Sequence, residues 1–343
     1  MSRNLMTALV FAVAIPLLAG CGSSSAVGES ERSIELLNVS YDPTRELWRD
    51  INSQFIEQYR KEKGIEVSIK QSHGGSGTQA RAVIDGLEAD VVTLAIWPDT
   101  DALRKNKLIA DGWEERLPNR SLPYISTIVF VVRKGNPKGI KDWPDLIKKD
   151  VEVITPNPKT SGNGKLSFLA AWGDVLQRGG SEDDAQKFVT ELYRHTPVLD
   201  TGARGSTTTF AQRNIGDVHL TWENEAHLEV AEAEGKLEIV YPPRSIQAEP
   251  HVTVVDGNVA RKGTKEVAEA YLNFLYTDRG QETIARHFYR PAVNTEILEK
   301  NAARFPNIEL FPITKVAGDW NAAQSRFFAE GGLFDQIYSS EKK

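Results

Sequence analysis

The sequence predicts an α/β protein made of two lobes, and two observations lead to this fold class. Apolar runs of strand length alternate with longer stretches whose apolar residues recur every three or four positions, in both halves of the chain. Three short stretches of small residues, at 72–77, 160–164 and 201–207, run directly into helix-like sequence. We therefore expect each lobe to hold a mostly parallel sheet flanked by helices, with two crossover segments as hinges.

The first half begins with a buried strand over residues 34–40. A helix follows, with Asp42 as its N-cap, Pro43 at its first position and Gly64 as its stop signal. Its apolar residues recur at every fourth position: Leu47, Ile51, Phe55 and Tyr59. Strands are expected over 65–69 and 91–95, with a helix over 80–87 between them. Ligands of such sheets bind beyond the carboxyl ends of the strands, where Asp42 and the 72–77 loop fall.

The second half repeats this pattern after an extended crossover near 125–135. Strands are expected over 151–154 and 218–222, and a helix over 166–176. Ser181 and Asp184 form a capping box that starts another helix. A second crossover near 247–256 leads to a returning strand and then to amphipathic helices. We therefore expect residues 33–130 and 250–343 to form lobe 1, and residues 131–249 to form lobe 2.

The first 20 residues have the layout of a secretory signal peptide. Arg3 supplies a positive charge, residues 5–18 are nearly all apolar, and small residues precede Cys21. This ending resembles a bacterial lipobox, which implies cleavage before Cys21 and a lipid chain on its sulfur. The alternative is an ordinary signal peptide followed by an incidental cysteine. Residues 21–32 are rich in Gly, Ser and Glu and are expected to form a flexible tether.

Composition excludes several classes of function. Without Arg3 the formal net charge of −6 becomes −7, so nucleic acid is not an expected partner. Cys21 is the only cysteine, so a cysteine-based zinc site and an internal disulfide are excluded. The histidines lack the spacing of metal ligands, and we expect neither a metal nor a cofactor.

The three stretches of small residues indicate an anion site. Backbone N–H groups at a helix start have no partner inside the helix, and the helix dipole there favours negative charge. One such loop is an ordinary turn, and Ser76 or Ser161 taken alone is explained by a turn or an N-cap. Trp222 taken alone is explained by packing. The sequence therefore predicts an anion site only if these groups converge on one cleft.

Five ordered motifs resemble those of bacterial periplasmic sulfate-binding proteins. They lie at residues 38–45, 71–77, 155–162, 202–207 and 222–226, and the similarity runs from about Ile34 to Ile337. The resemblance implies a type II periplasmic-binding-protein fold. It also implies a monomer that captures sulfate between its lobes and delivers it to the membrane permease of an ABC transporter. With the lipobox, it implies a periplasmic protein tethered to a membrane.

The resemblance also implies which groups contact sulfate. They are the hydroxyl of Ser161, the indole N–H of Trp222, and the backbone N–H groups of Asp42, Ser76, Gly162, Asn163 and Ala203. One departure is Asn163, because the family usually has a second glycine there. His73 and Arg204 flank the site, where they are expected to brace the loops rather than to neutralise the anion.

Elementary chemistry supports the same ligand. Sulfate offers only acceptor atoms, so a fitting site presents donors alone, whereas phosphate keeps a proton near neutral pH and needs an acceptor. Asp42 is the only nearby carboxylate, and we expect it to cap its own helix. Thiosulfate and molybdate remain alternatives because donors alone do not reveal cavity size. An alternative from another class is a secreted sulfate- or phosphate-ester hydrolase, for which no Ser-His-Asp arrangement is evident.

Overall fold

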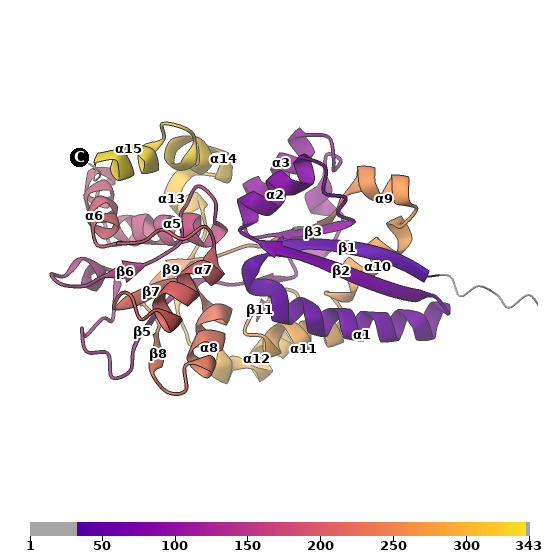
Figure 1. The fold of residues 1–343 in the computed structure, drawn as a ribbon, viewed down its shortest axis with the longest axis horizontal. Helices are drawn as coiled ribbons and strands as arrows, with labels where there is room; N and C mark the ends of the chain where they lie inside the picture. Colours follow the sequence, from indigo (N-terminus) through magenta and orange to yellow (C-terminus); the bar gives the residue numbers. More distant parts are fainter. Residues whose placement is uncertain (1–32, 341–343) are drawn as a thin grey trace, which may run out of the picture. The chain divides into compact units, whose positions relative to one another are not determined.

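The computed structural model describes residues 33–340, which contain two lobes, each built on a four-stranded sheet (Figure 1). The first sheet has the order β10-β3-β1-β2, with bounds His251–Val254, Val91–Leu94, Ser33–Tyr41 and Glu66–Gly74. The second has the order β6-β7-β5-β8, with bounds Val153–Ile154, Val218–Trp222, Ile128–Arg133 and Leu237–Val240. The predicted signal peptide, Cys21 and the tether lie outside the described residues.

The first sheet is mostly parallel, as predicted. Strand β1 runs parallel to β2 and β3, and β10 pairs with β3 in the antiparallel sense. Val91 and Val92, adjacent on β3, belong to different apolar clusters, so both faces of this sheet are covered. Tyr41 and Gly74, the last residues of β1 and β2, are register partners. The loops that follow them therefore leave the sheet at the same edge.

The second sheet differs from the prediction of a mostly parallel sheet. Strand β5 pairs antiparallel with both β7 and β8, and only β6 and β7 are parallel. A parallel pair requires a crossover connection, usually a helix. The chain enters β5 directly from the first lobe, without a preceding helix in the second lobe, so the strand–helix–strand rule does not fix its direction.

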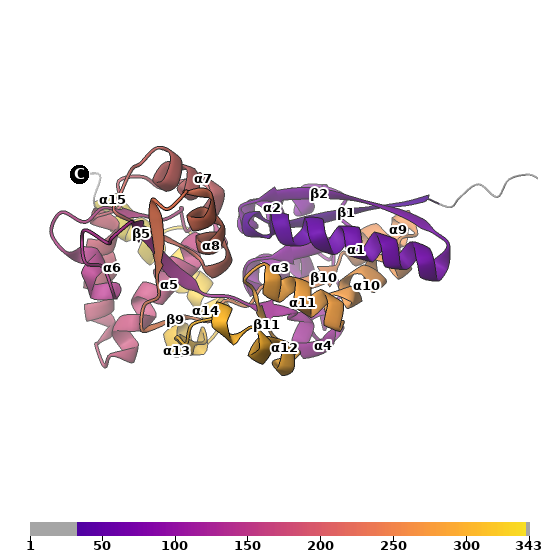
Figure 2. The same cartoon turned by 90° about the horizontal axis from the view of Figure 1, so that it is seen from below.

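Helices cover the faces of both sheets (Figures 1 and 2). Those of the first lobe are α1 (Arg45–Lys63), α2 (Ser76–Ile84), α3 (Trp97–Lys105), α4 (Pro118–Ser121), α9 (Asp256–Lys262), α10 (Lys265–Phe274), α11 (Asp278–Arg286) and α12 (Thr295–Lys300). Those of the second are α5 (Gly162–Gln177), α6 (Glu182–Arg194), α7 (Ala203–Thr207), α8 (Glu223–Glu232), α13 (Thr314–Ala317), α14 (Trp320–Ala323) and α15 (Leu333–Ser340).

Shorter elements complete the chain. They are the 3₁₀ turns η1 (Asp42–Thr44), η2 (Trp113–Glu115), η3 (Trp143–Ile147) and η5 (Ala302–Arg304), and the π-helical turns η4 (Thr208–Gln212) and η6 (Gln324–Phe328). Two-stranded pairings join β4 (Tyr124–Ile125) to β11 (Arg290–Pro291) and β9 (Arg244–Ile246) to β12 (Glu309–Phe311).

The two crossover segments are hydrogen-bonded to each other. The N–H of Ser126 donates to the oxygen of Ala248 at 3.0 Å, and the N–H of Ala248 donates back at 2.9 Å. The Thr127 hydroxyl also donates to the Ile246 oxygen at 2.8 Å. These two segments therefore form a narrow pair of extended strands between the lobes.

The end of the chain lies with the second lobe, which differs from its predicted place in lobe 1. Phe305 packs with Ala285 in the first lobe, whereas β12 pairs with β9 of the second. Beyond that point Phe327 lies against Phe168 and Trp172 of α5, with ring centroids 5.3 and 5.0 Å away. The amphipathic pattern predicts that these helices bury one face, but it does not indicate which lobe buries it.

Candidate functional site

The seven residues that the sequence brings forward as ligand contacts line one small cavity between the lobes. About 170 Å³ lies between the lining atoms when the open side of the cavity is included. The first lobe contributes Asp42 and Ser76, and the second contributes Ser161, Gly162, Asn163, Ala203 and Trp222. Sequence reasoning missed the other lining residues, namely Tyr41, Pro43, Gly74, Gly75 and Ala95. No pattern in the sequence singles out Ala95. It lines the cavity because β3, which it follows, runs parallel to β1 and ends at the same edge of the sheet.

Four helical segments begin at this cavity. Asp42 starts η1, Ser76 starts α2, Gly162 and Asn163 start α5, and Ala203 starts α7. N–H groups in the first turn have no acceptor inside their own helix, and the helix dipole adds partial positive charge there. The cavity is therefore surrounded by the positive ends of backbone dipoles.

Asp42 does not cap its helix, which corrects the prediction. The N-cap position belongs to Tyr41, and no side chain caps η1. The Asp42 carboxylate instead accepts a hydrogen bond from Arg45 Nη2 at 2.9 Å. The reason is that β1 extends one residue further than predicted, so the first turn begins at Asp42 itself.

The hydroxyls of Ser76 and Ser161 have different roles. Ser76 Oγ donates to Asp99 Oδ2 at 2.6 Å and accepts from the N–H of Ala95 at 3.0 Å, so it is engaged within the first lobe. Ser161 Oγ is the N-cap of α5 and accepts from the N–H of Gly164 at 3.4 Å. Its own proton remains for donation. Ser76 thus offers its backbone N–H, and Ser161 offers its hydroxyl.

Asn163 keeps regular helical geometry in the first turn of α5. Its side-chain Oδ1 accepts from the hydroxyl of Ser167 at 2.9 Å, one turn further on. The direction of a backbone N–H in a helix does not depend on the side chain. Asparagine here therefore presents its N–H as glycine does.

Trp222 is the last residue of β7 and is fully buried. Its ring lies 5.1 Å from that of Tyr41, the last residue of β1 in the other lobe. Burial raises the pKa of Tyr41 well above its usual value, so its hydroxyl stays neutral beside the cavity.

The cations near the cavity are paired with carboxylates. Arg204 Nη2 lies 2.7 Å from Glu46 and its Nε lies 2.9 Å from Glu225. Lys165 Nζ lies 3.3 Å from Asp99, and both side chains are almost fully buried. Among residues 33–340, none that lines the cavity is a cation, and the nearby Arg45 is paired with Asp42.

His73 is neutral at physiological pH. Burial lowers the pKa of its imidazole to about 4, and the charges of Arg45 and Arg204 act in the same direction. Its Nδ1 lies 2.7 Å from the hydroxyl of Ser40, inside the first lobe. His73 and Arg204 thus contact protein groups around the loops, as residues that brace them would.

Small residues allow the lobes to approach closely at the cavity. A Cβ on Gly162 would lie 2.4 Å from the Cβ of Ala95, and one on Gly75 would lie 2.7 Å from the oxygen of Thr160. A Cβ on Gly202 would lie 2.7 Å from Asp42 Oδ2. Each of these contacts joins one lobe to the other. The sequence identifies these glycines as turn residues and does not reveal this second role.

No group of three or more His, Cys, Asp or Glu side chains within residues 33–340 is arranged to hold a metal ion. Among the same residues, no helix combines the length and apolar character needed to cross a membrane.

Comparison with known proteins gives the family. Residues 38–290 match the model of the bacterial extracellular solute-binding proteins. The sulfate-binding protein of Escherichia coli K12 is 53% identical over 315 residues, which cover 91% of this chain and 95% of that protein. The thiosulfate-binding protein of Pseudomonas aeruginosa is 51% identical over 314 residues, covering 91% and 94%.

The chain belongs to the bacterial extracellular solute-binding protein family. Among solved structures of such binding proteins, the sulfate-binding protein SubI of Mycobacterium tuberculosis H37Rv matches with a TM-score of 0.78 and 31% identity. That match covers 86% of this chain and 99% of the other. A periplasmic thiamin-binding protein matches with a TM-score of 0.60 at 16% identity, which shows the shared fold. The predicted type II fold is confirmed.

The substitution Gly75→Ala is expected to hold the lobes apart. The backbone of Gly75 (φ −57°, ψ 135°) suits any residue, so the new methyl group acts through its contacts with the oxygens of Thr160 at 2.7 Å and Thr201 at 3.1 Å, both of the other lobe. Overpacking of about 1–3 kcal/mol would weaken sulfate binding at least about fivefold in calorimetry.

Gly77→Ala is the matched control, because a Cβ there would meet nothing closer than 3.7 Å. Equal affinities of the two variants would contradict a close approach of the lobes at Gly75.

Proposed function

We propose that this protein captures sulfate outside the cytoplasm and delivers it to the permease of an ABC transporter. The ion is enclosed between the lobes by seven donors: the backbone N–H groups of Asp42, Ser76, Gly162, Asn163 and Ala203, the Ser161 hydroxyl and the Trp222 indole. The protein acts as a monomer and catalyses no reaction. After cleavage before Cys21, a lipid on that residue tethers it to a membrane.

The observation that carries the proposal is a cavity lined by donors, where the single ionisable carboxylate is already occupied. Asp42 Oδ1 accepts from Arg45, and in this proposal that pair, rather than a protonated ligand, holds the carboxylate. A fully ionised tetrahedral oxyanion, which has only acceptor atoms, fits this arrangement. Phosphate near neutral pH carries a proton that would face no acceptor.

The size of the cavity also supports a small inorganic ion. The space of about 170 Å³, with its open side included, is bounded by main chain from both lobes, which favours a small ion over an ester with a bulky organic group. The hydroxyl of Ser161 has no histidine beside it among the lining residues, so the activated nucleophile of a hydrolase is missing.

The magnitudes allow tight binding without a counter-charge. Hydrogen bonds to a charged group contribute roughly 1.5–3 kcal/mol each. Seven of them give about 10–20 kcal/mol, against a cost of about 4–15 kcal/mol for association. Hydrogen bonds from backbone dipoles therefore allow the tight sulfate binding that a scavenging protein needs.

Thiosulfate is the second candidate ligand. The E. coli sulfate-binding protein and the P. aeruginosa thiosulfate-binding protein are nearly equally similar to this chain. Both ions are dianions that accept hydrogen bonds, so the same donors suit both. Thiosulfate has a sulfur atom in place of one oxygen of sulfate, and this larger atom needs a larger cavity.

An anion series tests the proposal directly. Calorimetry with sulfate, thiosulfate, molybdate and phosphate is expected to give tight binding of sulfate. Phosphate is expected to bind at least about fivefold more weakly, since about 1–3 kcal/mol is lost when its proton leaves a buried donor without an acceptor. Tighter binding of phosphate or molybdate would contradict it. Release of product from an aryl sulfate ester would contradict the absence of catalysis.

Trp222→Phe is expected to weaken sulfate binding by about 1–3 kcal/mol, because it removes one charge-assisted hydrogen bond while keeping an aromatic ring. Trp143→Phe is the matched control, since the indole of Trp143 donates at 2.8 Å to the Arg244 oxygen, away from the cavity. If calorimetry gave wild-type sulfate affinity for both variants, Trp222 would not be a ligand contact.

Sulfate affinity is expected to change by less than about threefold between pH 5 and pH 8. Sulfate carries no proton in this range, and His73, with its pKa near 4, stays neutral. Below pH 6.5 the unfolded chain binds a proton that folded His73 does not, so stability falls with decreasing pH and the titration stops at pH 5.

Glu225→Gln is the control for this titration, because burial raises the pKa of that carboxyl to about 7. A tenfold change in affinity per pH unit in both proteins would indicate a titrating acceptor in the cavity.

A further inference from the structure

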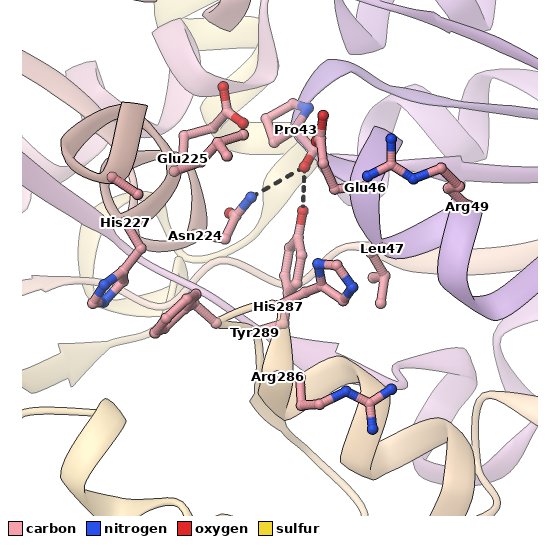
Figure 3. A pocket seen from close by; sticks show the side chains of 13 residues that line it. Pro43, Glu46, Leu47, Arg49, Asn224, Glu225, His227, Arg286, His287 and Tyr289 are labelled. Carbon is pink, nitrogen blue, oxygen red and sulfur yellow. Dashed lines mark hydrogen bonds between the residues drawn. The ribbon is translucent and has the colours of Figure 1, made fainter. Parts of the chain in front are cut away.

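The carbonyl oxygen of Pro43 is held from both lobes at once (Figure 3). Asn224 Nδ2, from the second lobe, donates to it at 3.1 Å. The hydroxyl of Tyr289, from the first lobe, donates to it at 2.7 Å. Both side chains are buried, with exposed fractions of 6% for Asn224 and 1% for Tyr289.

This contact lies immediately beside the proposed sulfate contacts. Pro43 follows Asp42 in η1, and Asn224 lies two residues after Trp222, in the first turn of α8. Nearby, the ring of His227 from α8 stacks on Phe288 of the first lobe, with centroids 3.8 Å apart. The hydrogen bond thus joins the two strand ends that each carry a proposed ligand donor.

We infer that Asn224 is a positioning residue that clamps the lobes together through the Pro43 carbonyl and so sets how long sulfate stays bound. The inference rests on the proposed function, but Asn224 itself does not line the sulfate cavity. It lines a neighbouring hollow between α1, α8 and the segment that contains Tyr289.

The arrangement suits a clamp that must also release. Tyr289 packs among the aromatic residues of the first lobe, where its ring lies 4.6 Å from Tyr124. It therefore stays with Pro43 when the lobes separate, and the carbonyl keeps a donor. Of the two bonds to the Pro43 oxygen, separation breaks only the one from Asn224, whose amide then reaches water.

The closed arrangement also carries a cost at the same residue. Asn224 Oδ1 is buried without a hydrogen-bond partner among the described residues. A buried unpaired acceptor is unfavourable, and opening hydrates it. The clamp is therefore too weak to close the lobes alone, and the ligand decides their state.

A second contact between the lobes, Arg204 with Glu46, has a different physical character. These side chains are 29% and 28% exposed, so salt screens their attraction. The Asn224–Pro43 bond is uncharged and buried, and screening leaves it unchanged. The contribution of Asn224 is thus expected to be the same at low and high salt.

The test is Asn224→Asp, a substitution of equal size that turns the donor into an acceptor facing the Pro43 carbonyl. Stopped-flow fluorescence is expected to show sulfate dissociating at least about tenfold faster at both salt concentrations, with an association rate close to that of the wild type. Asn224→Ala, which removes the donor without adding charge, is the second variant. It is expected to accelerate dissociation about two- to tenfold.

Asn258→Asp is the matched control, because Asn258 Nδ2 donates at 2.8 Å to the Ala89 oxygen entirely within the first lobe. It is expected to lower the unfolding temperature without changing the dissociation rate. Wild-type dissociation rates in both Asn224 variants would overturn the inference, and so would equal acceleration by Asn258→Asp. A wild-type protein that does not bind sulfate would instead overturn the proposed function.

Discussion

The fold depends on one constraint: backbone N–H groups at helix starts must point at a shared space without finding partners inside their own helices. Four helical segments from two lobes meet this condition at the cavity lined by Asp42, Ser76, Gly162 and Ala203. An isolated donor of this kind is costly when it is dry. The free energy of the empty site is therefore lowered either by water or by an anion. An anion that binds here therefore also gives these donors the acceptors that they lack.

Charge is kept out of the cavity by pairing around it. Lys165 lies against Asp99, which also accepts from the Ser76 hydroxyl, so a buried ion pair supports a loop that offers only its N–H. Backbone dipoles therefore contact the ligand directly, whereas the charged side chains are paired with each other outside the cavity. Because donors come from both lobes, the ligand strengthens their contact. Uncharged contacts such as Asn224 with Pro43 then adjust the rate of release.

The sequence predicted the first lobe and the site better than the second lobe. Strand–helix alternation gave β1, β2 and β3, and their shared edge followed from parallel pairing. The prediction of a mostly parallel second sheet and the predicted place of the last helices were wrong. Both depend on which lobe receives a segment, and local periodicity carries no such information. The role of Gly75 and Gly162 as points of contact was missed for the same reason. Asp42 was expected to be a cap because β1 was predicted one residue too short.

The central claim is that main-chain dipoles, one hydroxyl and one indole hold a dianion that no opposite charge touches. The most direct measurement is a crystal structure with selenate, a tetrahedral dianion whose selenium is located by anomalous scattering. The account predicts one selenium peak between the lobes, with oxygens within about 3 Å of the N–H groups of Asp42, Ser76 and Ala203 and of the Trp222 indole. A peak bonded directly to Arg45, Lys165 or Arg204 would contradict it.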